Sequence, residues 1–138
     1  MKQAAREIFV DTTGPGLVEI TPIVRHWILD ERMTTGLLTM LCRHTSASLT
    51  IQENASSDVR QDIVRWLGWV APDDAPYGHR EEGPDDMPAH IKAMLTGVSL
   101  SIPVIDGMMA LGQWQGVFLI EHRQNPQRRR IALHLIGT

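Results

Sequence analysis

The sequence predicts an α+β fold, a single domain over residues 1–138 in which mostly antiparallel strands are joined by about three helices. Seven or eight short segments carry strand patterns, and turn signals such as Asp106-Gly107 separate several of them. Only three segments space their apolar residues as a helix does. These segments do not alternate regularly with the strands, which argues against a parallel βαβ sheet.

The N-terminal part of the chain predicts two strands followed by a helix. The strands are expected at residues 4–10 and 17–20, with a Gly-Pro-Gly turn between them. Thr21 and Pro22 then predict the start of the helix, because threonine caps a first turn and proline fits the first helical position.

The next segments predict a pair of strands and the clearest helix of the chain. Residues 37–42 are an apolar run broken only by Thr39, which favours a strand buried on both faces. A second strand is expected at residues 48–52. Ser56 or Ser57 can cap the helix that follows, and its apolar stripe consists of Val59, Ile63, Trp66, Leu67 and Val70.

The C-terminal half predicts a long loop, a short helix and further strands. The polar loop spans residues 72–84, a length that is typical of functional or disordered segments. Pro88 opens the short helix and Gly97 closes it, and the side chains expected to point inward are Ile91, Met94 and Leu95. Strands are expected at residues 98–104, 108–111, 113–122 and 129–136.

Composition and charge narrow the class of protein. Hydrophobic residues make up 43% of the chain and charged residues 21%, which excludes a disordered or fibrous protein. The formal charge is −3, from 13 basic and 16 acidic residues, so we expect no nucleic-acid partner. The single cysteine, Cys42, fits a reducing compartment. Because no signal-peptide core and no apolar run of about 18 residues is found, we expect a cytoplasmic protein without a membrane partner.

One candidate site is a run of hydroxyl side chains beside a histidine. His44 follows an apolar strand and opens a run that continues with Thr45, Ser46 and Ser48. Hydroxyl and imidazole donors at the mouth of a buried strand suit phosphate oxygens, so we expect a phosphate site here. The alternative is a polar strand edge whose hydroxyls bond to nearby backbone in turns.

Two further histidines flank an acidic run. His79 and His90 lie 11 residues apart, and His44 lies 35 residues before His79. This spacing matches neither a helical HExxH motif nor a zinc finger. Three converging neutral imidazoles would nevertheless suit a zinc-like divalent metal with an open coordination position. Asp85 or Asp86 can cap the short helix, which leaves the other carboxylate free for a cation or a proton.

The last candidates lie in and after the predicted strand that begins at residue 113. Trp114 is expected in the core rather than as a platform for a ligand, whereas Gln115 needs a polar partner in an apolar strand. Glu121 and Arg123 share a strand face, where they can form an ion pair or bind a polar ligand. The three arginines at 128–130 are interpreted as a solvated turn, with the steering of anionic substrates as the alternative.

Three stretches of the chain together resemble the YjbQ family, also called the secondary thiamine-phosphate synthase family. They are CRHTSASLTI at 42–51 with ENA at 53–55, His79 with GPDDMPAHIK at 83–92, and LGQWQG at 111–116. The likeness extends over residues 17–137. It implies an α+β fold of the family's own and a homotrimer with sites near the subunit contacts. It also implies weak thiamine-phosphate synthase activity, which joins a pyrimidine diphosphate to a thiazole phosphate.

The resemblance further implies roles for individual residues. His44, His79 and His90 match histidines of the family that are expected to bind a metal or phosphate. Other recurrent polar positions of the family fall on Asn54, Asp58, Asp86, Gln115 and Glu121. The chain departs from many relatives at His122-Arg123, where an extra basic group can change the ligand.

The leading functional hypothesis is therefore a transferase that acts on a phosphorylated heterocycle. Its cofactor would be a divalent metal, zinc or similar, held by His44, His79 and His90. The catalytic candidates are Asp86 and Glu121, and the candidates for binding substrate and phosphate are Thr45, Ser46, Ser48, Asn54, Gln115 and Arg123. The alternatives are a metal-dependent hydrolase of a phosphorylated small molecule and a non-catalytic trimer that binds a metal or ligand. The sequence contains no P-loop, dinucleotide fingerprint or nucleophile elbow, which excludes the enzyme classes built on them.

Overall fold

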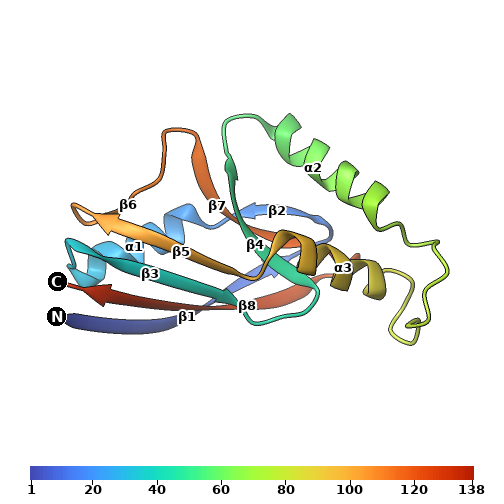
Figure 1. Ribbon diagram of the computed structural model, residues 1–138, viewed down its shortest axis with the longest axis horizontal. Coiled ribbons are helices and arrows are strands. Elements are labelled where there is room, and N and C mark those ends of the chain that lie inside the picture. The colour runs from blue at the N-terminus through green and yellow to red at the C-terminus, as the bar shows by residue number, and fades with distance from the viewer.

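The computed structural model describes residues 1–138 and contains three helices and eight strands (Figure 1). In chain order the elements are β1 (Lys2–Thr12), β2 (Gly16–Glu19), α1 (Thr21–Glu31), β3 (Thr35–Cys42), β4 (Ala47–Glu53), α2 (Ser57–Val70), α3 (Asp86–Thr96), β5 (Ser99–Ile105), β6 (Met108–Met109), β7 (Gln115–Glu121) and β8 (Gln127–Gly137). None of the three helices has the length and apolar character that crossing a membrane requires.

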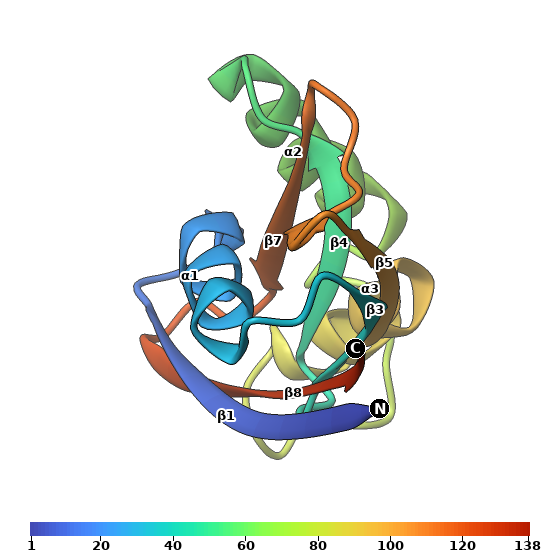
Figure 2. The same ribbon diagram turned by 90° about the vertical axis from the view of Figure 1, so that its left-hand side faces the viewer.

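The strands form two sheets in which every pairing is antiparallel. The larger sheet has the order β1-β8-β3-β5-β6 and the smaller one the order β2-β7-β4. Helix α1 and the smaller sheet both lie on one side of the β1–β8 pair (Figure 2). The predicted α+β fold, a single domain of mostly antiparallel strands with three helices, is therefore confirmed.

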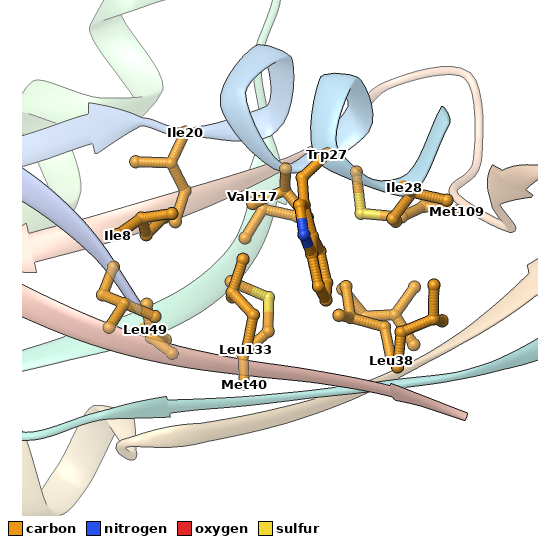
Figure 3. Close-up of a cluster of buried hydrophobic side chains, with 14 of the residues drawn as sticks. Ile8, Ile20, Trp27, Ile28, Leu38, Met40, Leu49, Met109, Val117 and Leu133 are labelled. Atoms are coloured by element: carbon orange, nitrogen blue, oxygen red, sulfur yellow. The ribbon is translucent and has the colours of Figure 1, made fainter. Parts of the chain in front are cut away.

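The main core lies between the larger sheet, helix α1 and the smaller sheet. Trp27 and Ile28 of α1 lie over Leu38 and Met40 of β3 and Leu133 of β8 (Figure 3). All five of these side chains are buried. Removing a side chain of this size from water contributes about 1.5–3 kcal/mol to folding, so this cluster fixes the framework on which the site is built.

Strand β3 differs from the prediction for residues 37–42, which were expected to be buried on both faces. Leu38, Met40 and Cys42 are buried, whereas Leu37 and Leu41 are exposed. Successive side chains of a strand point to opposite faces, and α1 covers only the inner face of this sheet. The outer face of the sheet therefore carries apolar side chains that no other part of the chain covers.

The start of helix α1 also differs by one residue from the prediction. Ile20 takes the cap position, and no side chain caps the first turn. Thr21 begins the helix, and its hydroxyl donates to Glu19 Oε2 at 2.8 Å. Pro22 lies in the first turn as predicted. The threonine oxygen does not cap the helix; it accepts the N–H of Val117 on β7 at 2.8 Å instead.

Helix α2 fully buries only one residue of the stripe that the sequence predicts to be buried. Ser56 caps the helix as expected, since its hydroxyl oxygen accepts from the Asp58 N–H at 3.3 Å. Of the predicted stripe only Leu67 is buried, while Trp66 and Val70 are exposed. The helix lies at the edge of the molecule, away from the larger sheet (Figure 1).

Helix α3 also buries a different face from the predicted one. Met94 is 75% exposed and Leu95 is exposed as well, although both were expected to point inward. Ala89 and Ala93 are buried instead, and the helix packs on β4. Small side chains let a helix approach a strand closely, so the alanines, rather than the larger residues, form the contact.

The Asp106-Gly107 turn is confirmed. It joins β5 to β6, in which Ile105 pairs with Met108. Both turn residues have positive φ, 52° and 79°. Two-residue hairpin loops of this kind require positive φ at both central positions, which favours Asp-Gly.

Candidate metal centre

The first turns of helix α3 place a carboxylate and an imidazole on one helix face. Asp86 and His90 are four residues apart in α3, a spacing at which helical side chains are neighbours. Asp86 is buried, with 2% of its side chain exposed, while the His90 side chain is 30% exposed. The carboxylate therefore forms the floor of the site and the imidazole part of its rim.

His79 approaches the same carboxylate from the long loop between α2 and α3. Its Nε2 lies 2.7 Å from Asp86 Oδ2, and Nε2 of His90 lies 3.0 Å from that oxygen. The ligand atoms of His79, Asp86 and His90 all lie within 4.8 Å of one another, and the two imidazole rings are 5.5 Å apart. Two imidazole nitrogens and one carboxylate are a donor set that suits zinc and similar divalent metals.

A hydrogen bond to the main chain orients the ring of His90. Nδ1 of His90 lies 2.8 Å from the carbonyl oxygen of Thr45, which can only accept, so Nδ1 carries a proton. In the neutral ring Nε2 is then unprotonated, and it lies close to Asp86 Oδ2 without forming a hydrogen bond to it. Two acceptor atoms 3.0 Å apart repel each other, and a proton on one of them or a cation bound to both removes this repulsion. Metal-binding histidines commonly have this arrangement, with the second ring nitrogen bonded to a carbonyl.

Arg123, a predicted substrate-binding residue, clamps the start of α3. Its guanidinium donates to Asp86 Oδ1 at 2.6 Å, to Asp85 Oδ2 at 3.1 Å and to the Glu82 carbonyl at 2.9 Å. Burial by itself raises the pKa of Asp86, but the hydrogen bond from His79 and the positive charges around it outweigh burial and hold the pKa below its usual range. Neither Asp85 nor Asp86 caps the helix with its side chain. The clamp keeps Asp86 ionised and in place.

Glu121, a predicted catalytic residue, lies in a buried ion pair. Arg129 donates to both of its oxygens, with Nε at 2.7 Å from Oε1, and Thr12 donates to Oε1 at 2.6 Å. The N–H groups of His122 and Arg123 donate to Oε2 at 3.0 and 3.1 Å. Burial raises the pKa of Glu121, but the bonds from Arg129 and Thr12 outweigh burial and lower it. With five donors on two buried oxygens, this carboxylate is placed to hold structure together.

His44 lies outside the group formed by His79, Asp86 and His90, so Asp86 takes the third place that the sequence analysis gave to His44. Its Nε2 accepts the Arg130 N–H at 2.7 Å. Burial, followed by the charge of Arg129, lowers the pKa of His44. The ring is therefore neutral at neutral pH, with its proton on Nδ1.

A cavity is bordered by His44 and by His90, one of the candidate metal ligands. It has a volume of about 550 Å³ and is lined by His44, Thr45, His90, Ala93, Met94, Gly97 and Val98. Pockets of roughly 300–1,000 Å³ are typical of small-molecule sites. The walls are mainly apolar, and the polar side chains among the lining residues are those of His44, Thr45 and His90.

The predicted hydroxyl run divides among three environments. Thr45 is exposed and lines the cavity. Ser46 Oγ accepts from Arg129 at 3.0 Å, and its carbonyl accepts from the same nitrogen at 3.1 Å. Ser48 is fully buried, with Oγ 2.6 Å from Thr96 Oγ1 and 2.9 Å from His122 Nε2. Of the three hydroxyl side chains, only that of Thr45 borders the cavity.

Two predicted substrate-binding residues lie at the far end of the smaller sheet. Gln115 pairs with Glu53, whereas Glu121 pairs with Ala47 at the opposite end of the same strand pair. Six residues of a strand span about 20 Å. Gln115 Oε1 accepts the Gly112 N–H at 2.7 Å, and Asn54 Nδ2 donates to Glu19 Oε2 at 3.2 Å. The structure therefore does not bring Asn54 and Gln115 to the histidine cluster.

The structure contradicts the sequence-based interpretations of Trp114 and Arg129. Trp114 was expected in the core, but it is exposed beside the Gln115 end of β7. Arg129 was interpreted as part of a solvated turn, but it is buried against Glu121. Its alternation with exposed neighbours in the β8 burial pattern is a strand signal that the run of three arginines conceals.

His122, expected from the sequence only as a departure from the family, is a buried structural residue. Thr96 donates its hydroxyl proton to the Lys92 carbonyl at 2.7 Å, so Ser48 must donate to Thr96, and His122 Nε2 must donate to Ser48. Burial is the main cause that lowers the pKa of His122, to about 4. A neutral imidazole thus locks β4, β7 and the end of α3 together.

Comparison with families and relatives gives consistent matches over the chain. A family model described as UPF0047 protein YjbQ-like matches residues 6–138. A UPF0047 protein of Synechocystis sp. is 42% identical over 137 residues, which cover 99% of this chain and 93% of that protein. The UPF0047 protein YjbQ of Salmonella typhimurium is 50% identical over 103 residues, 75% of each protein.

Solved structures give the same fold. A YbjQ-like protein of unknown function from Sulfolobus solfataricus matches with a TM-score of 0.91 over 99% of both chains, at 22% identity. A protein of the yjbq/upf0047 family from Clostridium acetobutylicum matches with a TM-score of 0.88 and 34% identity, over 95% of this chain and 99% of that one. The arrangement of two sheets and three helices is thus shared with proteins whose structures are solved.

Proposed function

The chain belongs to the YjbQ-like UPF0047 family, and from this premise we propose that it is a metal-dependent transferase acting on phosphorylated heterocycles. In this proposal His79, Asp86 and His90 hold a divalent metal, and the adjacent cavity receives the substrate. The reaction is the one implied by the sequence resemblance, in which a pyrimidine diphosphate and a thiazole phosphate form thiamine phosphate.

The observation that carries the proposal is the short approach of His90 Nε2 to Asp86 Oδ2. The main-chain bond from Nδ1 leaves the unprotonated Nε2 3.0 Å from a carboxylate oxygen, a contact between two acceptors that a positive charge stabilises. His79 adds a third ligand atom to the same place. One divalent cation satisfies all three groups together, whereas without it a proton is needed on Nε2 of each imidazole.

The exposure of the two histidines supports a catalytic centre rather than a closed structural one. The side chains of His79 and His90 are 40% and 30% exposed. Three protein ligands leave at least one coordination position for water or substrate, as in catalytic sites. A bound divalent metal neutralises charge that develops on phosphate oxygens.

The surrounding residues fit the charge changes of this transfer. A carbon–oxygen bond of the pyrimidine diphosphate breaks, its electron pair leaves with the diphosphate, and the thiazole nitrogen forms the new carbon–nitrogen bond. Thr45 and neutral His44 border the cavity and can donate to diphosphate oxygens. Asp86 has a lowered pKa, which suits a metal ligand better than a general acid.

Metal binding and turnover test the proposal separately. Calorimetric titration with Zn²⁺ is expected to give one site per chain in the unaltered protein, and His90→Ala is expected to abolish it. His26→Ala is the control, because His26 is exposed and pairs only with Asp30. The metal proposal is wrong if His90→Ala and His26→Ala bind zinc equally.

For turnover, the zinc-loaded protein is incubated with the pyrimidine diphosphate and the thiazole phosphate. Thiamine phosphate and diphosphate in equal amounts support the transferase. Diphosphate or phosphate released without thiamine phosphate supports a metal-dependent hydrolase, the second candidate, which the solvent exposure of both histidines favours. Zinc binding without any turnover leaves a metal-binding protein.

A homotrimer is part of the same proposal. The outer face of the larger sheet exposes Leu37 and Ile136, which are paired neighbours on β3 and β8, and it also exposes Leu41. Further copies of the chain would remove these side chains from water. Light scattering is expected to give about three times the chain mass of 15.5 kDa. A particle of one chain mass would refute the trimer.

A further inference from the structure

The buried ion pair between Glu121 and Arg129 lies at the junction of two chains of hydrogen bonds that both end at the candidate metal centre. Neither residue is among the three ligand candidates. Arg129 donates to both carboxylate oxygens of Glu121. Both side chains are almost fully buried: 5% of the Arg129 side chain is exposed and 0% of the Glu121 side chain.

The first chain of bonds runs through Arg129 to His90. The same Arg129 nitrogen that bonds Glu121 also donates to the Ser46 carbonyl at 3.1 Å and to Ser46 Oγ at 3.0 Å. Ser46 follows Thr45, whose carbonyl accepts from His90 Nδ1 at 2.8 Å. The position of this loop therefore sets the rotation and the protonated nitrogen of the His90 ring.

The second chain of bonds runs through Arg123 to Asp86. Glu121 Oε2 accepts the Arg123 N–H at 3.1 Å, which fixes the main chain where this arginine leaves β7. The Arg123 guanidinium then donates to Asp86 Oδ1 at 2.6 Å and leaves Oδ2 for the two imidazoles. The two residues in close contact, His90 and Asp86, are thus both held in place from one buried carboxylate, that of Glu121.

From this geometry we infer that Glu121 and Arg129 are the positioning residues of the metal centre, holding His90 through the loop at Ser46 and Asp86 through Arg123. The inference rests on the proposed metal site and assigns the pair no contact with substrate. The Glu121–Arg129 pair differs from an ordinary stabilising ion pair in one respect. Loosening the pair changes the relative placement of His90 and Asp86 in a protein that is still folded.

The test compares variants of the pair with a matched control, using Co²⁺ alone as the probe. Arg129→Lys keeps the positive charge but cannot reach both Glu121 oxygens and Ser46 together. Ser46→Ala removes one acceptor and leaves the ion pair intact, so it serves if Arg129→Lys does not fold. The control is Glu7→Gln, because Glu7 also bridges two arginines but on the exposed outer face.

Two readouts separate positioning from general stability. The Kd for Co²⁺ is expected to rise about 10–100-fold in Arg129→Lys, as for other groups that orient metal ligands, and less in Ser46→Ala. The visible absorption bands of bound Co²⁺ are expected to shift in both variants, because the bands report ligand geometry, and to stay unchanged in Glu7→Gln. Unchanged affinity and bands in folded variants of Arg129 and Ser46 would overturn the inference and leave the metal site standing.

If the unaltered protein binds no Co²⁺, the proposed function is wrong. The inference about Glu121 and Arg129 is then tested by a measurement that needs no metal. Nitrogen NMR of the imidazoles is expected to find the His90 proton on Nδ1 in the unaltered protein and in Glu7→Gln. In Arg129→Lys the two nitrogens are expected to share the proton, because the Thr45 carbonyl is no longer held. A proton that remains on Nδ1 in this variant would overturn the inference.

Discussion

Lowering the pH is expected to destabilise the protein through His122 before its carboxylates are protonated. His122 is buried, and its Nε2 donates to Ser48 in a chain of bonds that ends on the Lys92 carbonyl. Burial is the main cause of its low pKa, about 4, and the positive charge of Lys92 lowers it further. Arg129 acts in the same direction, and Glu121 opposes them.

The magnitude follows from the difference in proton affinity between the folded and unfolded chains. The pKa of His122 is about 4 when folded and 6.5 when unfolded, so the unfolded chain binds more protons between these values and stability falls as the pH falls. Between pH 7 and pH 4.5 the loss from this one group amounts to about 2 kcal/mol. The contribution of His122 is fully present above pH 6.5 and lost by about pH 4.

The contribution of His122 is measured by urea unfolding at several pH values. The unaltered protein is compared with His122→Gln. Glutamine keeps a donor for Ser48 but does not titrate, so the variant is expected to lose about 2 kcal/mol less over this range. His44 also has a lowered pKa, and it contributes equally to both proteins. The reasoning is refuted if both proteins have the same pH dependence, or if NMR titration gives His122 a midpoint near 6.5.

Three further predictions concern packing and reactivity. Gly36→Ala is expected to lower the free energy of unfolding by about 1–3 kcal/mol, because the new Cβ would lie 2.5 Å from a backbone oxygen of β8. Gly68→Ala is expected to raise the free energy of unfolding by about 0.5–1 kcal/mol, because Gly68 has free space around it in α2. Denaturant titration of both variants checks the opposite signs. Leu38→Ala is expected to cost about 2–5 kcal/mol and Leu37→Ala much less, since the first is buried and the second exposed; equal costs would contradict the assignment of the two sheet faces. Cys42 is buried and burial raises its pKa to about 11, so a thiol reagent is expected to react with the native protein much more slowly than with the protein in urea.

Local signals account for most of what the sequence predicts correctly. The Asp106-Gly107 turn and the strand near residues 98–104 depend on residues close in sequence, and both are found. The outer face of β3 could not be predicted in the same way. An apolar run such as 37–42 looks alike whether one face or two are buried, and only the placement of α1 decides it.

The same difference between local and long-range signals applies to the candidate site. His79, His90 and Asp86 were all candidates from sequence, and the four-residue spacing of Asp86 and His90 in one helix is a local signal that favours Asp86 as the third ligand. The place of His44 was not predictable, since Nε2 meets the main chain of Arg130, 86 residues away in sequence. Arg129 was misjudged because its partner Glu121 becomes visible only when β7 and β8 are placed.

The position of β8 in the larger sheet has a consequence for the order of folding. This strand, residues 127–137, lies between β1 and β3 and supplies the only strand partner of β1. During synthesis β1 is therefore made first, and it cannot pair until more than a hundred further residues have been synthesised. Long-range pairing of this kind is slow, and an unpaired strand edge can meet the wrong chain. Arg129 lies on this same late strand, so the site acquires its supporting ion pair only as the sheet closes.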